Sequence, residues 1–130
     1  MVGMDNCGFE GNIMSMFNPK FCSYSPVSDL RLLKRNSHAP ETVAEMSSMF
    51  PEGIDFLFID GDHSYAGVKQ DYEDYSPLVR PGGLVAFHDT LMSPEEDVLH
   101  SMGVSRLWRE ITDRPKKGFE VSFGIGLVYM

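Results

Sequence analysis

The run Ile54–Ile59, with the sequence IDFLFI, is the feature that most constrains how this chain can fold. It is almost continuously apolar, which is typical of a strand in a parallel sheet that is covered on both faces. A second apolar run, at residues 84–87, follows a segment with helical spacing. Two parallel strands joined by a crossover helix have this pattern, so the sequence predicts an α/β fold.

Helix signals stand between and after these two strands. Pro40 opens a helix that Gly53 stops. Ser64 caps the crossover helix. Ser93 begins a short helix with a capping-box sequence, and another helix follows Gly103. The aromatic residues at helical spacing in these segments are predicted to belong to the core: Tyr72, Tyr75 and Trp108.

The remaining elements are predicted from shorter signals. Residues 1–5 and 30–34 read as strands, and residues 80–83 (RPGG) as a turn. Residues 119–123 alternate in polarity and residues 124–130 are apolar, which predicts a closing antiparallel hairpin. Residues 6–28 read as a loop-rich segment with one helical turn.

Composition limits the function classes. The 130 residues, 42% of them apolar, predict one domain over 1–130. A net charge of −8 argues against nucleic acid and membrane surfaces as partners. The chain has no apolar run of about 18 residues and no signal-peptide pattern, so we expect a soluble, cytoplasmic protein. Cys7 and Cys22 fit neither a zinc nor a redox motif, and buried or idle thiols are expected.

Acidic residues and histidines follow the predicted strands. Ligands bind at the carboxyl ends of the strands in an open parallel sheet. Asp60 and Asp89 stand there and can hold a divalent cation, with Asp62 or His88 near them. The alternative is that both acids cap the turns that follow their strands.

Two further roles are open on this evidence. Asp62 or His63 could take a proton from a hydroxyl held near the metal, although a histidine beside a helix start is more often a capping or surface residue. Asp5 could accept hydrogen bonds from a ribose, or it could be a turn aspartate.

The block IDFLFIDGDHSYAGVKQDYEDYSPLVRPGGLVAFHDT, residues 54–90, resembles class I S-adenosylmethionine-dependent methyltransferases. It is most similar to the group of sugar and antibiotic O-methyltransferases and cephalosporin-hydroxylase-like proteins. The resemblance implies a Rossmann-like three-layer sandwich, with a mostly parallel sheet and a C-terminal antiparallel hairpin. It also implies transfer of a methyl group from S-adenosylmethionine to a hydroxyl of a small molecule or sugar, with Mg²⁺ or Mn²⁺ assisting.

The resemblance assigns roles to individual residues. Asp60, His88 and Asp89 match metal ligands, with His88 at a place where relatives often have an acidic residue. Asp62 matches the candidate base, and His63 is a second possibility. The cofactor-binding positions are Asp5, Asn36, Ser37 and Asp60, and residues 93–102 would cover the substrate.

One departure from the family is large. The strand and glycine-rich turn that begin such methyltransferases are missing, so the fold is expected to be truncated at its N-terminus. This leaves an edge of the strand 54–59 unpaired, which is unfavourable for an apolar strand. Residues 1–5, a partner or a second copy of the chain must fill the gap, and we expect a homodimer.

Three functions follow as hypotheses. The first is a metal-assisted O-methyltransferase. The second is a truncated or degenerate methyltransferase-fold domain without activity that serves as a binding or assembly module. The third, a metal-dependent hydrolase, is weaker, because no nucleophile or second acidic cluster supports it.

Overall fold

The computed structural model describes residues 2–4 and 31–130, and it divides at residue 37 into two compact units. The first unit holds the strands β1 (Val2–Met4) and β2 (Arg31–Leu33), which pair in parallel. Both lie within the predicted strands. The predictions for residues 6–28, Cys7 and Cys22 included, lie outside the described residues.

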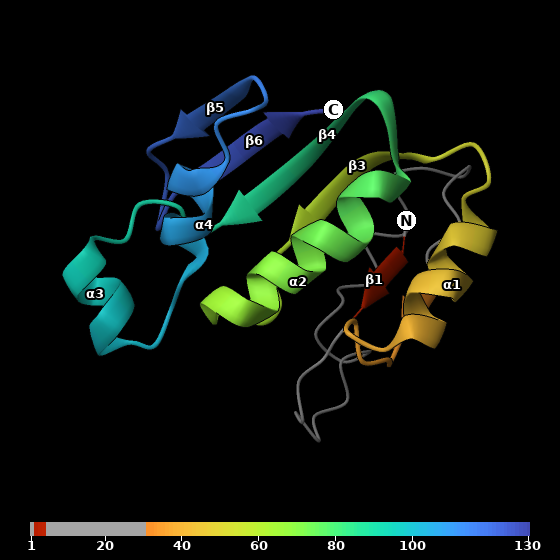
Figure 1. Ribbon diagram of the computed structural model, residues 1–130, viewed down its shortest axis with the longest axis horizontal. Coiled ribbons are helices and arrows are strands. Elements are labelled where there is room, and N and C mark those ends of the chain that lie inside the picture. The colour runs from red at the N-terminus through yellow and green to blue at the C-terminus, as the bar shows by residue number, and fades with distance from the viewer. Residues whose placement is uncertain (1, 5–30) are drawn as a thin grey trace, which may run out of the picture. The chain divides into compact units, whose positions relative to one another are not determined.

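The second unit, residues 38–130, contains a four-stranded sheet with the order β3-β4-β6-β5 (Figure 1). Its strands are β3 (Ile54–Ile59), β4 (Val79–His88), β5 (Lys116–Phe119) and β6 (Ile125–Tyr129). The pair β3–β4 is parallel, and β6 is antiparallel to both β4 and β5. The predicted parallel pair and closing hairpin are confirmed.

Four α-helices and one 3₁₀ turn complete the second unit. They are α1 (Pro40–Met49), α2 (Tyr65–Tyr75), η2 (Ser76–Leu78), α3 (Pro94–Leu99) and α4 (Val104–Glu110). The predicted caps are confirmed: the Ser64 side chain accepts from the backbone N–H of Gly67, and Ser93 and Glu96 form a capping box. The helix α2 ends at Tyr75, two residues before Pro77, because proline cannot donate a backbone hydrogen bond.

The core lies between the sheet and the helices α2 and α4, which Figure 1 shows over the same side of the strands. Phe87 of β4 is fully buried, with its ring centroid 5.5 Å from that of Tyr72 on α2 and 6.4 Å from that of Trp108 on α4. Tyr75 is buried as well. Of the aromatic residues predicted for the core, Tyr75 is buried, whereas Tyr72 and Trp108 are partly buried and pack against the core. These contacts fix the crossover helix against the strands whose ends carry the polar residues.

Two predicted boundaries are wrong. Residues 80–83 lie within β4 rather than between elements, and there Gly82 donates to the carbonyl of Met130 and Gly83 accepts from the Met130 N–H. The chain still turns at this place, because Gly82 has a φ of +82° and the register against β3 shifts between Val79 and Leu84. The first strand of the hairpin is Lys116–Phe119 rather than 119–123. Residues 120–124 form the connection, in which the N–H of Gly124 donates to the carbonyl of Val121.

None of the helices in the described part of the chain has the length and apolar character needed to cross a membrane.

Candidate functional site

Asp60 and Asp89 come together because β3 and β4 are parallel neighbours that end at the same edge of the sheet. Ile59 is in register with Phe87, so Asp60 directly follows one strand end and His88 and Asp89 finish the other. His63 lies in the short loop between β3 and α2. Because this loop begins at the carboxyl end of β3, His63 stays close to the ends of β3 and β4.

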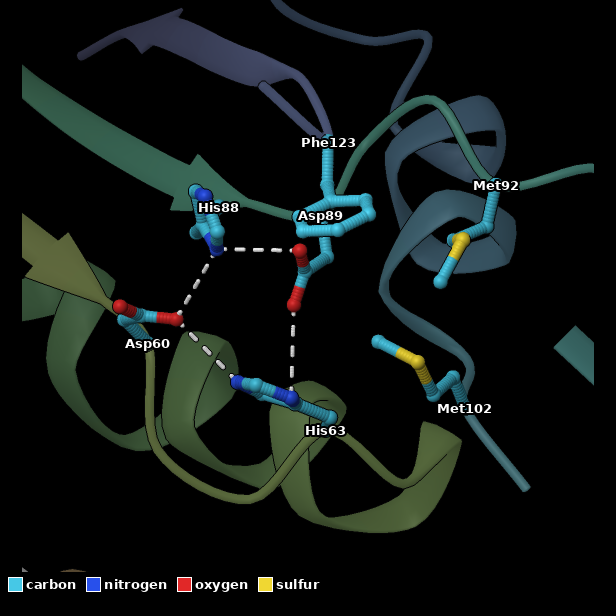
Figure 2. Close-up of a pocket in the computed structure, with 7 residues that line it drawn as sticks. All are labelled: Asp60, His63, His88, Asp89, Met92, Met102 and Phe123. Carbon is cyan, nitrogen blue, oxygen red and sulfur yellow. Dashed lines mark hydrogen bonds and ion pairs between the residues drawn. The ribbon is translucent and has the colours of Figure 1, made fainter. Parts of the chain in front are cut away.

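The four side chains form a closed ring of contacts in which carboxylates and imidazoles alternate (Figure 2). His63 Nε2 lies 3.2 Å from Asp60 Oδ1, and His63 Nδ1 lies 3.3 Å from Asp89 Oδ2. His88 Nδ1 lies 3.4 Å from Asp60 Oδ1 and 3.0 Å from Asp89 Oδ1. Each carboxylate thus contacts both imidazoles.

Asp89 is held in this ring by an unusual backbone conformation. Its φ is +62°, in the left-handed region that residues other than glycine rarely adopt, although aspartate tolerates it better than most. The residue is 5% exposed. A buried carboxylate needs partners, and here the two imidazoles provide them.

Three of the four residues can each offer a ligand atom to one divalent cation. Asp60, His63 and Asp89 each offer a ligand atom, and these three atoms all lie within 4.8 Å of one another. Two carboxylates with imidazole suit Mn²⁺, Fe²⁺ or Zn²⁺ as well as Mg²⁺.

A cavity of about 400 Å³ opens beside the ring. Besides the four polar residues, the side chains that line it are apolar: Met92, Met102 and Phe123 (Figure 2). No pattern in the sequence marks any of these three residues as part of a site. Met102 closes the predicted covering segment, but Phe123 was assigned to a strand, and only the observed turn brings it to the cavity.

Asp62 points elsewhere. Its Oδ1 accepts the backbone N–H of Ser64 at 2.9 Å, at the start of α2, and this hydrogen bond lowers the pKa of the carboxyl. Asp62 does not line the cavity, whereas His63 does. Of the two candidate bases, the structure brings only His63 to the paired carboxylates.

The predicted cofactor residues are divided between the units. Asp5 lies outside the described residues. Asn36 and Ser37 follow β2 in the first unit, where Asn36 is exposed and Ser37 buried, and Asp60 belongs to the second unit. Their roles in binding S-adenosylmethionine stay predictions.

Comparison with known proteins identifies the family. A family model described as a methyltransferase domain matches residues 23–90, which is more than half of the chain. A curated relative, the uncharacterized protein y4gI of Sinorhizobium fredii, is 35% identical over 77 residues, covering 58% of this chain and 8% of that protein.

Solved structures agree on the fold. The MycE methyltransferase of the mycinamycin biosynthetic pathway, in complex with Mg, SAH and mycinamycin VI, matches with a TM-score of 0.58 and 18% identity, over 98% of this chain and 35% of that one. A Staphylococcus aureus protein described as a caffeoyl-CoA O-methyltransferase matches with a TM-score of 0.64 and 16% identity, over 98% of this chain and 62% of that one.

The chain therefore spans less than two thirds of the length of each of these three proteins. The predicted Rossmann-like methyltransferase fold is confirmed. Since the family model covers more than half of its residues, this chain belongs to the methyltransferase-domain family, as the resemblance to class I methyltransferases implied.

Proposed function

We propose that the chain is an S-adenosylmethionine-dependent, divalent-metal-assisted O-methyltransferase that acts on a hydroxyl of a small molecule or sugar. The observation that carries this proposal is the ring of Asp60, His63, His88 and Asp89 at the carboxyl ends of β3 and β4. MycE, a methyltransferase of the same fold, is named as a complex with Mg and SAH, which supports this combination of cofactors.

In this proposal, Asp60 and Asp89 would hold the cation, with His88 beside both, and His63, which could also offer a ligand atom, would serve as the base. A cation in that position favours the deprotonated form of an acceptor hydroxyl, and S-adenosylmethionine supplies the methyl group. His63 takes the proton of the hydroxyl. We assign this role to His63 rather than Asp62, because Asp62 does not line the cavity and its carboxylate accepts from the N–H of Ser64.

The first experiment measures metal binding, by electron paramagnetic resonance with Mn²⁺. We expect the wild-type chain to bind Mn²⁺ and both Asp60→Asn and Asp89→Asn to weaken binding by about tenfold or more. Asp55→Asn is the matched control, since Asp55 lies near the opposite end of β3. Equal affinities in all four proteins would contradict the metal site.

The second experiment separates the two possible roles of His63. If His63 is the base, His63→Gln keeps its Mn²⁺ affinity and loses methyl transfer by about 10²-fold to 10⁴-fold. A loss of Mn²⁺ affinity in His63→Gln would instead make His63 a ligand. Calorimetry with Mg²⁺ or Mn²⁺ present tests the cofactor, and the absence of S-adenosylmethionine binding would overturn the proposed activity of this chain.

A second candidate function is a methyltransferase-fold domain without activity that serves as a binding or assembly module. It is favoured by β3, which pairs with β4 and with no other strand among residues 2–4 and 31–130. A stable dimer that binds neither cofactor nor Mn²⁺ would favour this function, and methyl transfer by a monomer would exclude it.

A further inference from the structure

A second cavity, of about 380 Å³, lies between α3, α4 and the start of α2. It is separate from the ring of carboxylates and imidazoles, but Met102 lines both cavities. Its polar lining residues are Tyr65, Asp97, Ser101, Arg106 and Arg109. In a chain with a net charge of −8, a cavity lined by two arginines is unexpected and calls for an explanation.

The two arginines come from one face of α4, because residues three apart on a helix are neighbours. Arg106 is held from two sides: its Nε donates to Glu110 Oε1 at 2.9 Å, and its Cζ lies 3.9 Å above the ring of Tyr65. The Tyr65 hydroxyl donates to Glu110 Oε2 at 2.6 Å. The guanidinium of Arg106 is therefore fixed in direction, while its side chain stays 58% exposed.

Arg109 is fixed in the same way from the side of α3. Its Nη2 donates to Asp97 Oδ2 at 3.2 Å, and its Nη1 donates to the carbonyl of Met92 at 3.3 Å. Asp97 is 7% exposed and is also held by the hydroxyl of Ser105. Arg109 lines the second cavity, and its hydrogen-bond partner Met92 lines the first, so this hydrogen bond joins residues of the two cavities.

These contacts leave donors unused. A guanidinium carries five N–H donors, of which Arg106 uses one and Arg109 two in the hydrogen bonds given above. The carboxylates of Glu110 and Asp97 balance the formal charge of the two guanidiniums, so the arginines offer oriented N–H groups at a partly exposed surface rather than a net positive charge. The N–H groups of two guanidiniums held in fixed directions match the arrangement of oxygen atoms in a phosphate or a carboxylate.

We propose that the second cavity binds an anionic group, phosphate or carboxylate, of the methyl acceptor. This inference deepens the proposed function and rests on it: the hydroxyl of the acceptor lies at Asp60 and Asp89, and the anionic group at Arg106 and Arg109. Met102 lies between the two sites. The acceptor is thus a hydroxylated small molecule that carries an acidic group, rather than a neutral sugar.

The test is a nuclear magnetic resonance titration of the full chain with inorganic phosphate, following the arginine Nε–Hε signals. We expect saturable shifts of the Arg106 and Arg109 signals. Arg80 is the internal control, because it is 49% exposed, close to Arg109 at 47%, and is likewise paired, with Asp55. Shifts at Arg80 as large as those at Arg106, or shifts that do not saturate, would overturn the proposal.

Variants sharpen the result. Arg106→Gln should weaken phosphate binding by about tenfold, the effect of losing one charge-assisted hydrogen bond, and Arg80→Gln should leave it unchanged. Arg109 also links α4 to α3 through Asp97, so its removal could destabilise the fold. Arg109→Lys keeps the charge at this position, and its melting temperature is measured in parallel to detect a loss of stability. Unchanged phosphate binding in Arg106→Gln would contradict the site.

A parallel titration with acetate decides the class of anion. Saturable binding of acetate indicates a carboxylate acceptor, binding of phosphate alone indicates a phosphorylated one, and binding of neither overturns the proposal. Because these titrations contain no metal or cofactor, their failure is distinguishable from a failure of the proposed function, which the Mn²⁺ measurement reports.

Discussion

Asp89 illustrates what a single residue contributes here. Its place after an apolar strand made it a candidate ligand, and the structure adds that its φ of +62° and its burial turn the carboxylate toward His63 and His88. Strained backbone at strand ends is often found at functional sites. Asp62 stands two residues from Asp60, yet its carboxylate stabilises the start of α2 instead.

Tyr75 gives a prediction at this scale. Burial, together with the nearby carboxylates of Asp71 and Asp74, raises the pKa of Tyr75 to about 12. The folded state therefore favours the neutral phenol, whose stabilising contribution is complete below pH 10, the ordinary value, and is lost as the pH rises toward about 12. We expect Tyr75→Phe to lose less stability than the wild type over this interval.

The measurement for Tyr75 is the melting temperature as a function of pH, followed by circular dichroism. Tyr72, whose pKa burial also raises, is present in both proteins and serves as a shared background. Parallel alkaline slopes for the wild type and Tyr75→Phe would show that Tyr75 is not the titrating group.

Among the elements, β6 and α4 pack so closely that only glycine fits at one position. A Cβ on Gly126 would lie 2.7 Å from Trp108 Cε3, whereas a Cβ on Gly118, its partner on β5, would lie 3.8 Å from Trp108 Cζ2. The first distance requires the ring to shift, and the second is an ordinary contact. The indole of Trp108 thus sets how closely α4 approaches the hairpin.

The prediction is that Gly126→Ala destabilises the fold by about 1–3 kcal/mol, the usual cost of overpacking a filled core. Gly118→Ala is the matched control and should change the free energy of unfolding by less than about 1 kcal/mol. Urea unfolding followed by Trp108 fluorescence measures both. Equal losses in the two variants would mean that the cost comes from the strand backbone and not from the indole.

For the molecule as a whole, the main feature is that β3 pairs with β4 and with no other strand in the described part of the chain, residues 2–4 and 31–130. The face beside it carries Phe56 and Phe58, which are 54% and 48% exposed. An apolar strand with an unpaired edge tends to pair with another chain. We propose that a second copy of the chain covers this edge, which would make the protein a homodimer.

The prediction for the dimer uses one charged substitution at each edge of the sheet. Phe58→Lys should convert the dimer to a monomer, because a lysine on an edge strand opposes pairing. Phe119→Lys is the control, since Phe119 is 39% exposed and lies on β5, the strand at the other edge. Light scattering after gel filtration measures the mass, and a monomeric wild type, or equal effects of both substitutions, would contradict the proposal.

The sequence by itself determined the elements of the second unit and their connection. Apolar runs, caps and helical spacing depend on neighbours along the chain, so they predicted β3, α2, the Ser64 cap and the Ser93 capping box correctly. The rule that parallel strands end at one edge also predicted the meeting of Asp60 and Asp89. Boundaries at residues 80–83 and 119–123 were wrong, because hydrogen bonds from distant residues decide them.

Only the tertiary structure decided which side chains face each other. The choice of His63 over Asp62 at the cavity, the position of Phe123 and the pairing of Arg109 with Asp97 all depend on loop geometry and on contacts between elements. Neighbouring residues point in different directions when a single backbone dihedral changes, and no local pattern in the sequence records that change. The sequence therefore determined which residue types stand at the strand ends, and the packing of helices and loops around them decided how their side chains are arranged.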